Sequence, residues 1–293
     1  MANVSVRRVI RRVNTLHDIV NSRRIEAYRR DGAVLLPNLV SEEWLQILKE
    51  GIEDNLNNPG PNAAVRVSDG RGRMFFEDAG VWRHNRAYAR FMFESLMPRT
   101  ASLLTGKEEL RVFFDNLFIK DPGIEAPTPW HQDLPYTPMD GEMCSLWVAL
   151  EDIAADYSLE LIAGSHQWGR SFRPISFSAE PVDKPGFNTL ERQPNVEQLR
   201  EEHTVLNWPV SAGDVIAFDG MTLHASASNG AARRRHSFIA RYAVDGAMYI
   251  PRGPGEYPSF PDCALSAGML LNAPQFPLVE LSDQPSPVHD WRP

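Results

Sequence analysis

The stretch Trp130-His131-Gln132-Asp133 places an imidazole and a carboxylate two residues apart, directly after the proline-rich turn Ala126-Pro127-Thr128-Pro129. In an extended strand, residues i and i+2 point to the same face, and their Cα atoms lie about 6.6 Å apart. Two such side chains can reach one metal ion. A histidine from a distant strand would complete a set of two histidines and one carboxylate, which is the ligand set of non-haem iron(II) oxygenases.

His224 is the candidate for that third ligand. It follows a turn and an apolar segment at residues 213–218, a pattern that predicts a buried strand. In a jelly roll, the strands that carry His131 and His224 can lie side by side despite the long separation in the chain. Without the other motifs, His131 could equally be an ordinary strand histidine and His224 an ordinary loop histidine. Five other histidines are expected to be structural: His166 because it lies in a tight turn, and His17, His84, His203 and His289 because they have no partner at ligand spacing.

Arg235 is the candidate for holding an anionic co-substrate. It begins the predicted strand 235–242, and a buried arginine needs an anion, for which a carboxylate suits the two-pronged guanidinium. By alternation Arg235 and Ser237 share a face, so His236 points the other way and is a poor ligand candidate. The nearby arginines at 233, 234 and 241 remain competitors.

Composition excludes several classes of protein. The net charge of -8 argues against nucleic-acid binding. The sequence contains no apolar run of 18 residues, so no membrane span is expected. Two cysteines, Cys144 and Cys263, make neither a disulfide framework nor a zinc site, which indicates a cytoplasmic protein. The basic N-terminus lacks the apolar core of a secretory signal, and we expect it to be an arm or first helix rather than a targeting segment.

The order of predicted elements favours a mainly β fold with flanking helices. Helices are expected at 25–31, at 42–55 behind the N-cap Ser41, and at 87–104. A short strand is expected at 32–37, between the first two of these helices. The later strands are short and separated by turns, which indicates a jelly roll with the N-terminal helices packed on one sheet. These strands are expected at 110–120, 143–150, 159–163, 204–210, 214–219 and 236–244.

We expect one domain over residues 1–293. It would comprise a helical part at about 1–106, a jelly-roll core at about 107–246 and an irregular tail at about 247–293. Residues 62–83 are expected to be an irregular lid or surface loop, and 170–202 a long excursion with a short helix near 195–202. Substrate contacts are expected from these two segments and from 134–140, with Tyr136 and Arg73 as the candidate residues.

In combination these motifs resemble the phytanoyl-CoA dioxygenase family of Fe(II)- and 2-oxoglutarate-dependent oxygenases. The resemblance covers roughly residues 25–245. One departure is the segment Ala155-Asp156-Tyr157-Ser158-Leu159, where the family often has an Asn-Gly turn; this alters a turn near the site mouth but removes no ligand. The matching segments are Pro127–Tyr136, Ser145–Leu150, Leu161–His166 with Trp168-Gly169, and Gly213–Arg235.

The resemblance implies a cupin-like double-stranded β-helix that binds Fe(II) through His131, Asp133 and His224. Arg235 and Ser226 would then bind the far carboxylate of 2-oxoglutarate, with Trp147 beside the co-substrate and Asn116 as a further contact. The implied cofactors are Fe(II), 2-oxoglutarate and O2, with ascorbate as a candidate reductant. No further catalytic residue is needed, because the cofactors carry the chemistry. Related halogenases replace the carboxylate with a small residue, so Asp133 favours hydroxylation.

The resulting hypothesis is a dioxygenase that hydroxylates an unactivated C–H bond of a small-molecule metabolite and releases succinate and CO2. Desaturation, ring closure or epimerisation could follow from the same hydrogen abstraction. An acyl-CoA 2-hydroxylase of the same family is one alternative. From other classes, a cupin-like metal-dependent isomerase or hydrolase and a non-catalytic binding module stay open. The sequence sets neither the substrate nor the oligomeric state.

Overall fold

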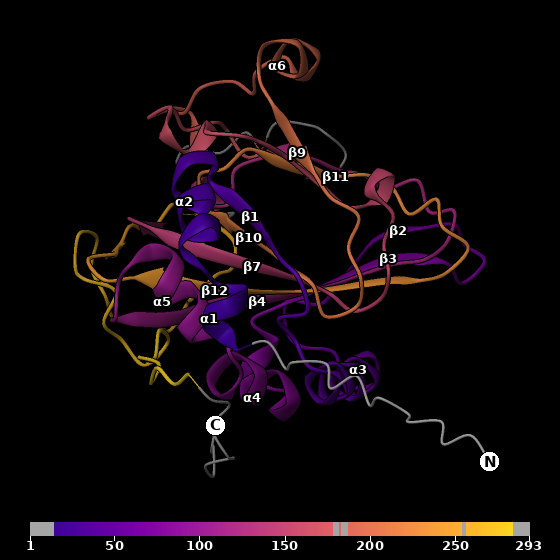
Figure 1. Cartoon of the computed structure of the whole chain (residues 1–293), viewed down its shortest axis with the longest axis horizontal. Helices are drawn as coiled ribbons and strands as arrows, with labels where there is room; N and C mark the ends of the chain where they lie inside the picture. The colour runs from indigo at the N-terminus through magenta and orange to yellow at the C-terminus, as the bar shows by residue number, and fades with distance from the viewer. Residues whose placement is uncertain (1–14, 178–181, 183–186, 254–255, 284–293) are drawn as a thin grey trace, which may run out of the picture.

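The computed structural model describes residues 15–177, 182, 187–253 and 256–283. Within them, two antiparallel sheets face each other (Figure 1), and β13 and β6 form a separate two-stranded sheet. The larger sheet has the strand order β1-β10-β7-β12-β4-β3-β2, and the smaller has the order β5-β11-β8-β9. The strands are β1 Ala33–Leu36, β2 Ala64–Ser68, β3 Met74–Ala79, β4 Leu110–Lys120, β5 Thr128–His131, β6 Met139–Asp140, β7 Met143–Ala149, β8 Leu159–Ile162, β9 Val205–Asn207, β10 Val215–Asp219, β11 His224–Ser226, β12 Arg235–Val244 and β13 Met248–Tyr249.

The core strands form the predicted jelly roll. The chain passes repeatedly between the two sheets: β4, β7, β10 and β12 pair in the larger sheet, and β5, β8, β9 and β11 pair in the smaller. As a result, strands distant in sequence become neighbours, such as β4 with β12 and β5 with β11. The expectation of a mainly β, double-stranded β-helix is therefore confirmed.

The N-terminal helices cover the outer face of the larger sheet, as predicted. Figure 1 shows α3 and α4 on the side of this sheet away from β9 and β11. Phe238 of β12 stacks on Tyr88 of α4 at 4.9 Å between ring centroids and meets Phe91 edge-on at 5.5 Å. The helices are α1 Leu16–Ile19, α2 Ser22–Asp31, α3 Glu42–Asn57, α4 Arg86–Glu94, α5 Met97–Thr105 and α6 Val196–Glu202, with 3-10 turns η1 Val81–Arg83, η2 Leu134–Tyr136, η3 Ala155–Tyr157 and η4 Ser165–Gln167.

Alternation along β12 divides the larger sheet into two chemically different faces. Phe238, Ala240 and Tyr242 belong to the apolar core under the helices. The intervening side chains, from Arg235 to Arg241, point toward the smaller sheet and line a cavity there. Polar and charged side chains on this inner face are what a binding site between the sheets requires.

Two predictions about the N-terminal half were wrong. Residues 62–83 contain the hairpin β2–β3, which extends the larger sheet beyond β4. The expected helix 87–104 is two helices, because Pro98 lacks an N–H and is tolerated only in a first turn. The chain is extended at Ser95, which ends α4, and α5 restarts with Pro98 in its first turn.

Apart from the short strand β13, the described part of the C-terminal tail is irregular, as expected, but it is not confined to the surface. Phe276 is fully buried and packs with Phe113 at 5.6 Å and with Phe260 at 4.8 Å between ring centroids. The tail also carries Tyr257 into the interior beside Asn116. Among the described residues, no helix combines the length and hydropathy needed to span a membrane.

Candidate functional site

The three predicted metal ligands come together between the sheets. His131 ends β5 and pairs directly with His224, which begins β11. One ligand atom from each of these residues and from Asp133 lies within 4.8 Å of the other two. Asp133 Oδ1 is 3.5 Å from Nε2 of His131 and 3.7 Å from Nε2 of His224. Two imidazole nitrogens and one carboxylate oxygen therefore face one point, a donor set that fits a divalent iron.

The route by which Asp133 reaches this point differs from the expected one. Its backbone is helical (φ -71°, ψ -46°), because it directly precedes the 3-10 turn η2. Pro135 in that turn has the fixed φ that a helical first turn uses. Residues 131 and 133 are therefore not on one extended strand; the turn folds the carboxylate back toward the imidazoles.

Backbone carbonyls orient both imidazoles. Nδ1 of His131 lies 2.7 Å from the carbonyl oxygen of Pro129, and Nδ1 of His224 lies 2.9 Å from that of Thr222. Since a carbonyl only accepts, each Nδ1 carries the hydrogen and each Nε2 presents its lone pair to the centre. Burial, and then the neighbouring His131, lower the pKa of His224 to about 3, so its ring is neutral, as a metal ligand must be.

Asp133 is held by its second oxygen. Oδ2 accepts hydrogen bonds from Nε of Arg241 at 2.9 Å and from the hydroxyl of Ser145 at 3.2 Å, which leaves Oδ1 toward the imidazoles. Burial by itself would raise the pKa of Asp133, but the charge of Arg241 opposes it, and the pKa lies well below its usual range. The carboxylate is therefore ionised and aimed before any metal arrives.

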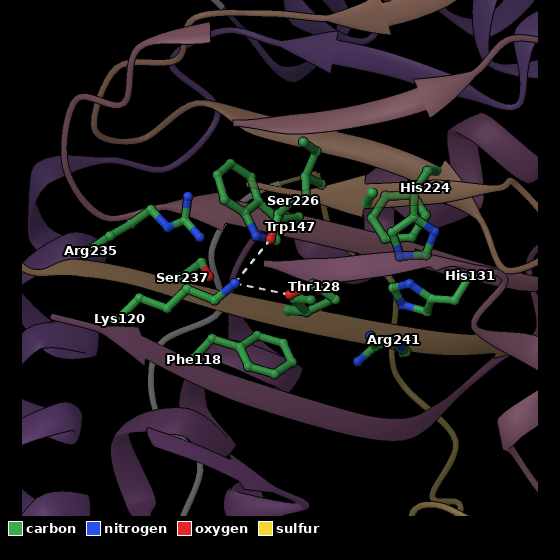
Figure 2. A pocket seen from close by; sticks show the side chains of 14 residues that line it. Phe118, Lys120, Thr128, His131, Trp147, His224, Ser226, Arg235, Ser237 and Arg241 are labelled. Carbon is green, nitrogen blue, oxygen red and sulfur yellow. Dashed lines mark hydrogen bonds between the residues drawn. The ribbon is translucent and has the colours of Figure 1, made fainter. Parts of the chain in front are cut away.

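A cavity beside the imidazoles contains the residues expected to hold a co-substrate (Figure 2). Arg235 from β12, Ser226 from β11 and Trp147 from β7 all line it, and His131 and His224 lie at one end. The guanidinium of Arg235 donates to the backbone carbonyls of Tyr157 and Ala227. Burial lowers its pKa to about 10, although the charge of Glu151 opposes this, and the side chain stays cationic.

The competing candidates for these roles lie elsewhere. Arg233 and Arg234 are exposed, and Arg234 pairs with Asp121. His236 points away from the cavity to Glu151, with 3.1 Å between Nδ1 and the carboxylate. Arg241 lines the cavity but is paired with Asp133, so among the arginines considered Arg235 alone is both buried and without a carboxylate partner in the described chain.

A second cavity of about 490 Å³ adjoins the first at the metal ligands. It receives residues from all three segments expected to contact substrate. Tyr136 lines it, and its hydroxyl is 2.8 Å from the carbonyl oxygen of Ile175. Arg73 does not line it: this side chain is exposed at the β2–β3 turn, where it binds Asp69 at 2.7 Å. Arg66, from the same hairpin, takes a place in the wall instead.

Asn116 lies in the wall of this second cavity and not in that of the first. Its Oδ1 accepts a hydrogen bond from Nη1 of Arg241 at 2.6 Å, and its Nδ2 donates to Glu77 at 3.3 Å and to the Tyr257 hydroxyl at 3.1 Å. It therefore links the arginine that holds Asp133 to the opposite wall, and its contact with the co-substrate stays a prediction.

The site also contains residues that the sequence analysis missed, among them Lys120, Glu77 and Tyr257. The first two carried a usable signal: Lys120 shares strand parity with Asn116 and Phe118, and Glu77 with Phe75, so both are charged residues at inward positions of apolar strands. Tyr257 had no such signal in the sequence, because it lies in an irregular segment where strand alternation does not apply.

Comparisons with known proteins agree with this arrangement. The family model "Phytanoyl-CoA dioxygenase (PhyH)" matches residues 28–237. No curated protein sequence is significantly similar to the chain. The solved epimerase SnoN from nogalamycin biosynthesis is 22% identical, with a TM-score of 0.69 over 88% of this chain and 98% of SnoN, and it was also crystallised with Fe3+, alpha ketoglutarate and nogalamycin RO.

Two further solved structures share the fold. The carbocyclase SnoK, also from nogalamycin biosynthesis, is 21% identical, with a TM-score of 0.71 over 91% of this chain and 99% of SnoK. EctD from S. alaskensis, crystallised with 2-oxoglutarate and 5-hydroxyectoine, is 21% identical, with a TM-score of 0.59 over 76% of each chain.

Proposed function

The chain belongs to the phytanoyl-CoA dioxygenase family, and from that membership we propose that it oxidises an unactivated C–H bond of a small organic molecule, using Fe(II), O2 and 2-oxoglutarate and releasing succinate and CO2. The observation that carries the proposal is the convergence of His131, Asp133 and His224 at the junction of two cavities. Bound iron and 2-oxoglutarate would activate O2, which is the oxidant. The protein holds and orients the reactants and excludes water.

The two cavities suggest a division of labour. His131, Thr128, Phe118 and Arg241 line both, so they form the boundary between the cavities. The cavity with Arg235 is buried between the sheets and offers a cation to a dicarboxylate. The larger cavity is of the size that binds drug-sized ligands, and it would place a C–H bond beside the metal ligands.

The wall of the larger cavity favours an uncharged, largely apolar substrate that contains rings. Its charged side chains are paired with one another: Arg66 binds Glu77 at 2.6 Å, and Arg241 binds Asp133 at 2.9 Å. Aromatic side chains supply much of the remaining wall, and rings pack well on rings. These side chains are Phe114, Phe118, Tyr136, Phe177 and Tyr257.

An acyl-CoA is the alternative substrate within the family. Its phosphates need cations, and in the described part of this wall each cationic side chain already has a carboxylate partner. The small-molecule alternative is also consistent with SnoN, which was crystallised with nogalamycin RO. Hydroxylation, epimerisation and ring closure share the first hydrogen abstraction. Asp133 completes the ligand set and so favours these reactions over halogenation, and among them we propose hydroxylation.

The test is succinate formation by protein purified without oxygen and supplied with Fe(II), 2-oxoglutarate and then O2. We expect turnover to rise with polycyclic aromatic compounds and to be unaffected by acyl-CoA thioesters. The matched control is His131→Ala, which should form no succinate. A wild-type protein that consumes no 2-oxoglutarate under any condition, but converts a substrate with another divalent metal, would favour the isomerase or hydrolase alternative.

We also propose that residues 1–293 act as one domain. The larger sheet takes strands from β1 to β12, and helices α3, α4 and α5 between them pack on that sheet. Neither the N-terminal helical part nor the jelly-roll strands would therefore bury their apolar faces alone. A cytoplasmic location stays a prediction.

A further inference from the structure

Lys120 is a buried cation that the proposed reaction has not yet used. It ends β4, is 2% exposed, and lines the same cavity as Arg235. Its ammonium donates hydrogen bonds to the hydroxyls of Thr128 at 3.0 Å and Ser226 at 3.3 Å, and it lies 4.6 Å from the centre of the Phe75 ring. All of these partners are uncharged, and a buried charge without a counter-charge is costly.

A second cation directly opposite increases that cost. Lys120 and Arg235 are paired residues of the neighbouring strands β4 and β12, and both side chains point into the cavity. Like charges placed opposite each other on adjacent strands destabilise a sheet. Within the described chain, Arg235 binds only backbone carbonyls through its guanidinium, so neither cation has a carboxylate at ion-pair distance.

The nearest acidic group does not relieve the pair. Glu77 on β3 attracts Lys120, but its carboxylate is held by Arg66 at 2.6 Å and by the Tyr257 hydroxyl at 2.8 Å. Burial and then Arg235 lower the pKa of Lys120 well below its usual value, in spite of Glu77. The fold thus places two basic side chains without a carboxylate partner in one enclosed space, and an anionic ligand there would stabilise their charged forms.

Figure 2 shows how such a ligand would lie. Lys120 and Arg235 enter the cavity at one end, and the imidazoles of His131 and His224 lie at the other. A short molecule with an acidic group at each end would span the two. We propose that Lys120, together with Arg235, binds the far carboxylate of 2-oxoglutarate and thereby selects a dicarboxylate over a monocarboxylate 2-oxo acid. This inference rests on the proposed function.

The test compares 2-oxoglutarate with 2-oxovalerate, which has the same chain length but no far carboxylate. Both are titrated calorimetrically into Mn(II)-loaded wild type, Lys120→Met and, as a matched control, Lys107→Met, whose lysine is exposed. We expect Lys120→Met to weaken 2-oxoglutarate binding roughly tenfold to a hundredfold, as expected for losing one charge-assisted contact. Its affinity for 2-oxovalerate and for Mn(II), and all affinities of Lys107→Met, should be unchanged.

Thermal unfolding separates this role from a structural one. Without ligand, Lys120→Met should melt at or above the wild-type temperature, because a buried, repelled charge is gone; the rise in melting temperature caused by 2-oxoglutarate should shrink. Equal 2-oxoglutarate affinity in Lys120→Met, or an equal loss for both 2-oxo acids, would overturn the inference. Failure of the wild type to bind 2-oxoglutarate would instead overturn the proposed function.

Discussion

Replacing Asp115 with asparagine should change how the stability of the protein depends on pH. Asp115 is fully buried on β4, where its Oδ2 accepts a hydrogen bond from the backbone N–H of Trp82 at 3.0 Å. Its Oδ1 has no hydrogen-bond partner in the described part of the chain. Burial raises the pKa of this carboxyl from 3.8 to about 7, and the backbone hydrogen bonds offset burial only in part.

The sign and size of the effect follow from that shift. A carboxyl with a higher pKa in the folded than in the unfolded protein binds its proton more tightly when folded. Its stabilising contribution is complete below about pH 4 and is lost as the pH rises through about 7. The shift corresponds to a loss of roughly 4 kcal/mol at 1.36 kcal/mol per unit, because an ionised Asp115 must be buried without a counter-charge.

Urea unfolding between pH 4 and 8.5, followed by circular dichroism, measures this loss. The free energy of unfolding of the wild type should fall relative to that of Asp115→Asn by about 4 kcal/mol across the range. The matched control is Asp262→Asn at an exposed aspartate, which should keep a constant difference from the wild type. A constant difference for Asp115→Asn as well would refute the reasoning, since it would mean that Asp115 is not protonated in the folded protein.

Three further predictions concern the site and the core. His131→Ala and Asp133→Ala should each abolish turnover and lose tight Fe(II) binding, measured by metal analysis after gel filtration; retained iron in both would contradict their role as ligands. Arg235→Ala should weaken 2-oxoglutarate binding roughly tenfold to a hundredfold in a direct titration while sparing the metal. Arg234→Ala is the control and should bind 2-oxoglutarate as the wild type does. A larger loss of affinity in Arg234→Ala than in Arg235→Ala would show that the wrong arginine was chosen. Phe238→Ala should lower the free energy of unfolding by about 3–5 kcal/mol, because it leaves a cavity between β12 and α4. A loss below about 1 kcal/mol in urea unfolding would contradict the packing described.

Much of the jelly roll could be predicted because its strands have local signatures. The strand at 110–120 is rich in apolar and aromatic residues, and β4 has the predicted bounds. The hairpin β2–β3 was missed because Glu77 and Asp78 interrupt its apolar pattern, and both are buried. Their partners are Arg66 on the paired strand β2, at 2.6 Å, and Asn55 on α3, at 2.9 Å. A strand whose buried charges are paired in space does not look like a strand locally.

The site divides in the same way. Alternation along 235–241 correctly placed Arg235, Ser237 and Arg241 on one face, since side-chain direction in a strand is a local property. Alternation did not place Asp133, whose helical backbone is set by the turn that follows. The substrate contact expected of Arg73 rested on its segment alone; Arg66 of that segment lies in the cavity wall, and Arg73 lies on the surface.

The amino-acid sequence by itself determined which residues are chemically able to bind iron and a dicarboxylate, and on which side of each strand they lie. Only the tertiary structure decided which of them share a cavity: it placed Lys120 opposite Arg235 and brought Tyr257 from the tail to Glu77. The physical reason is the range of the interactions. Backbone alternation acts over two residues, whereas the contact between β4 and β12 joins segments more than a hundred residues apart and depends on the closure of the whole sheet.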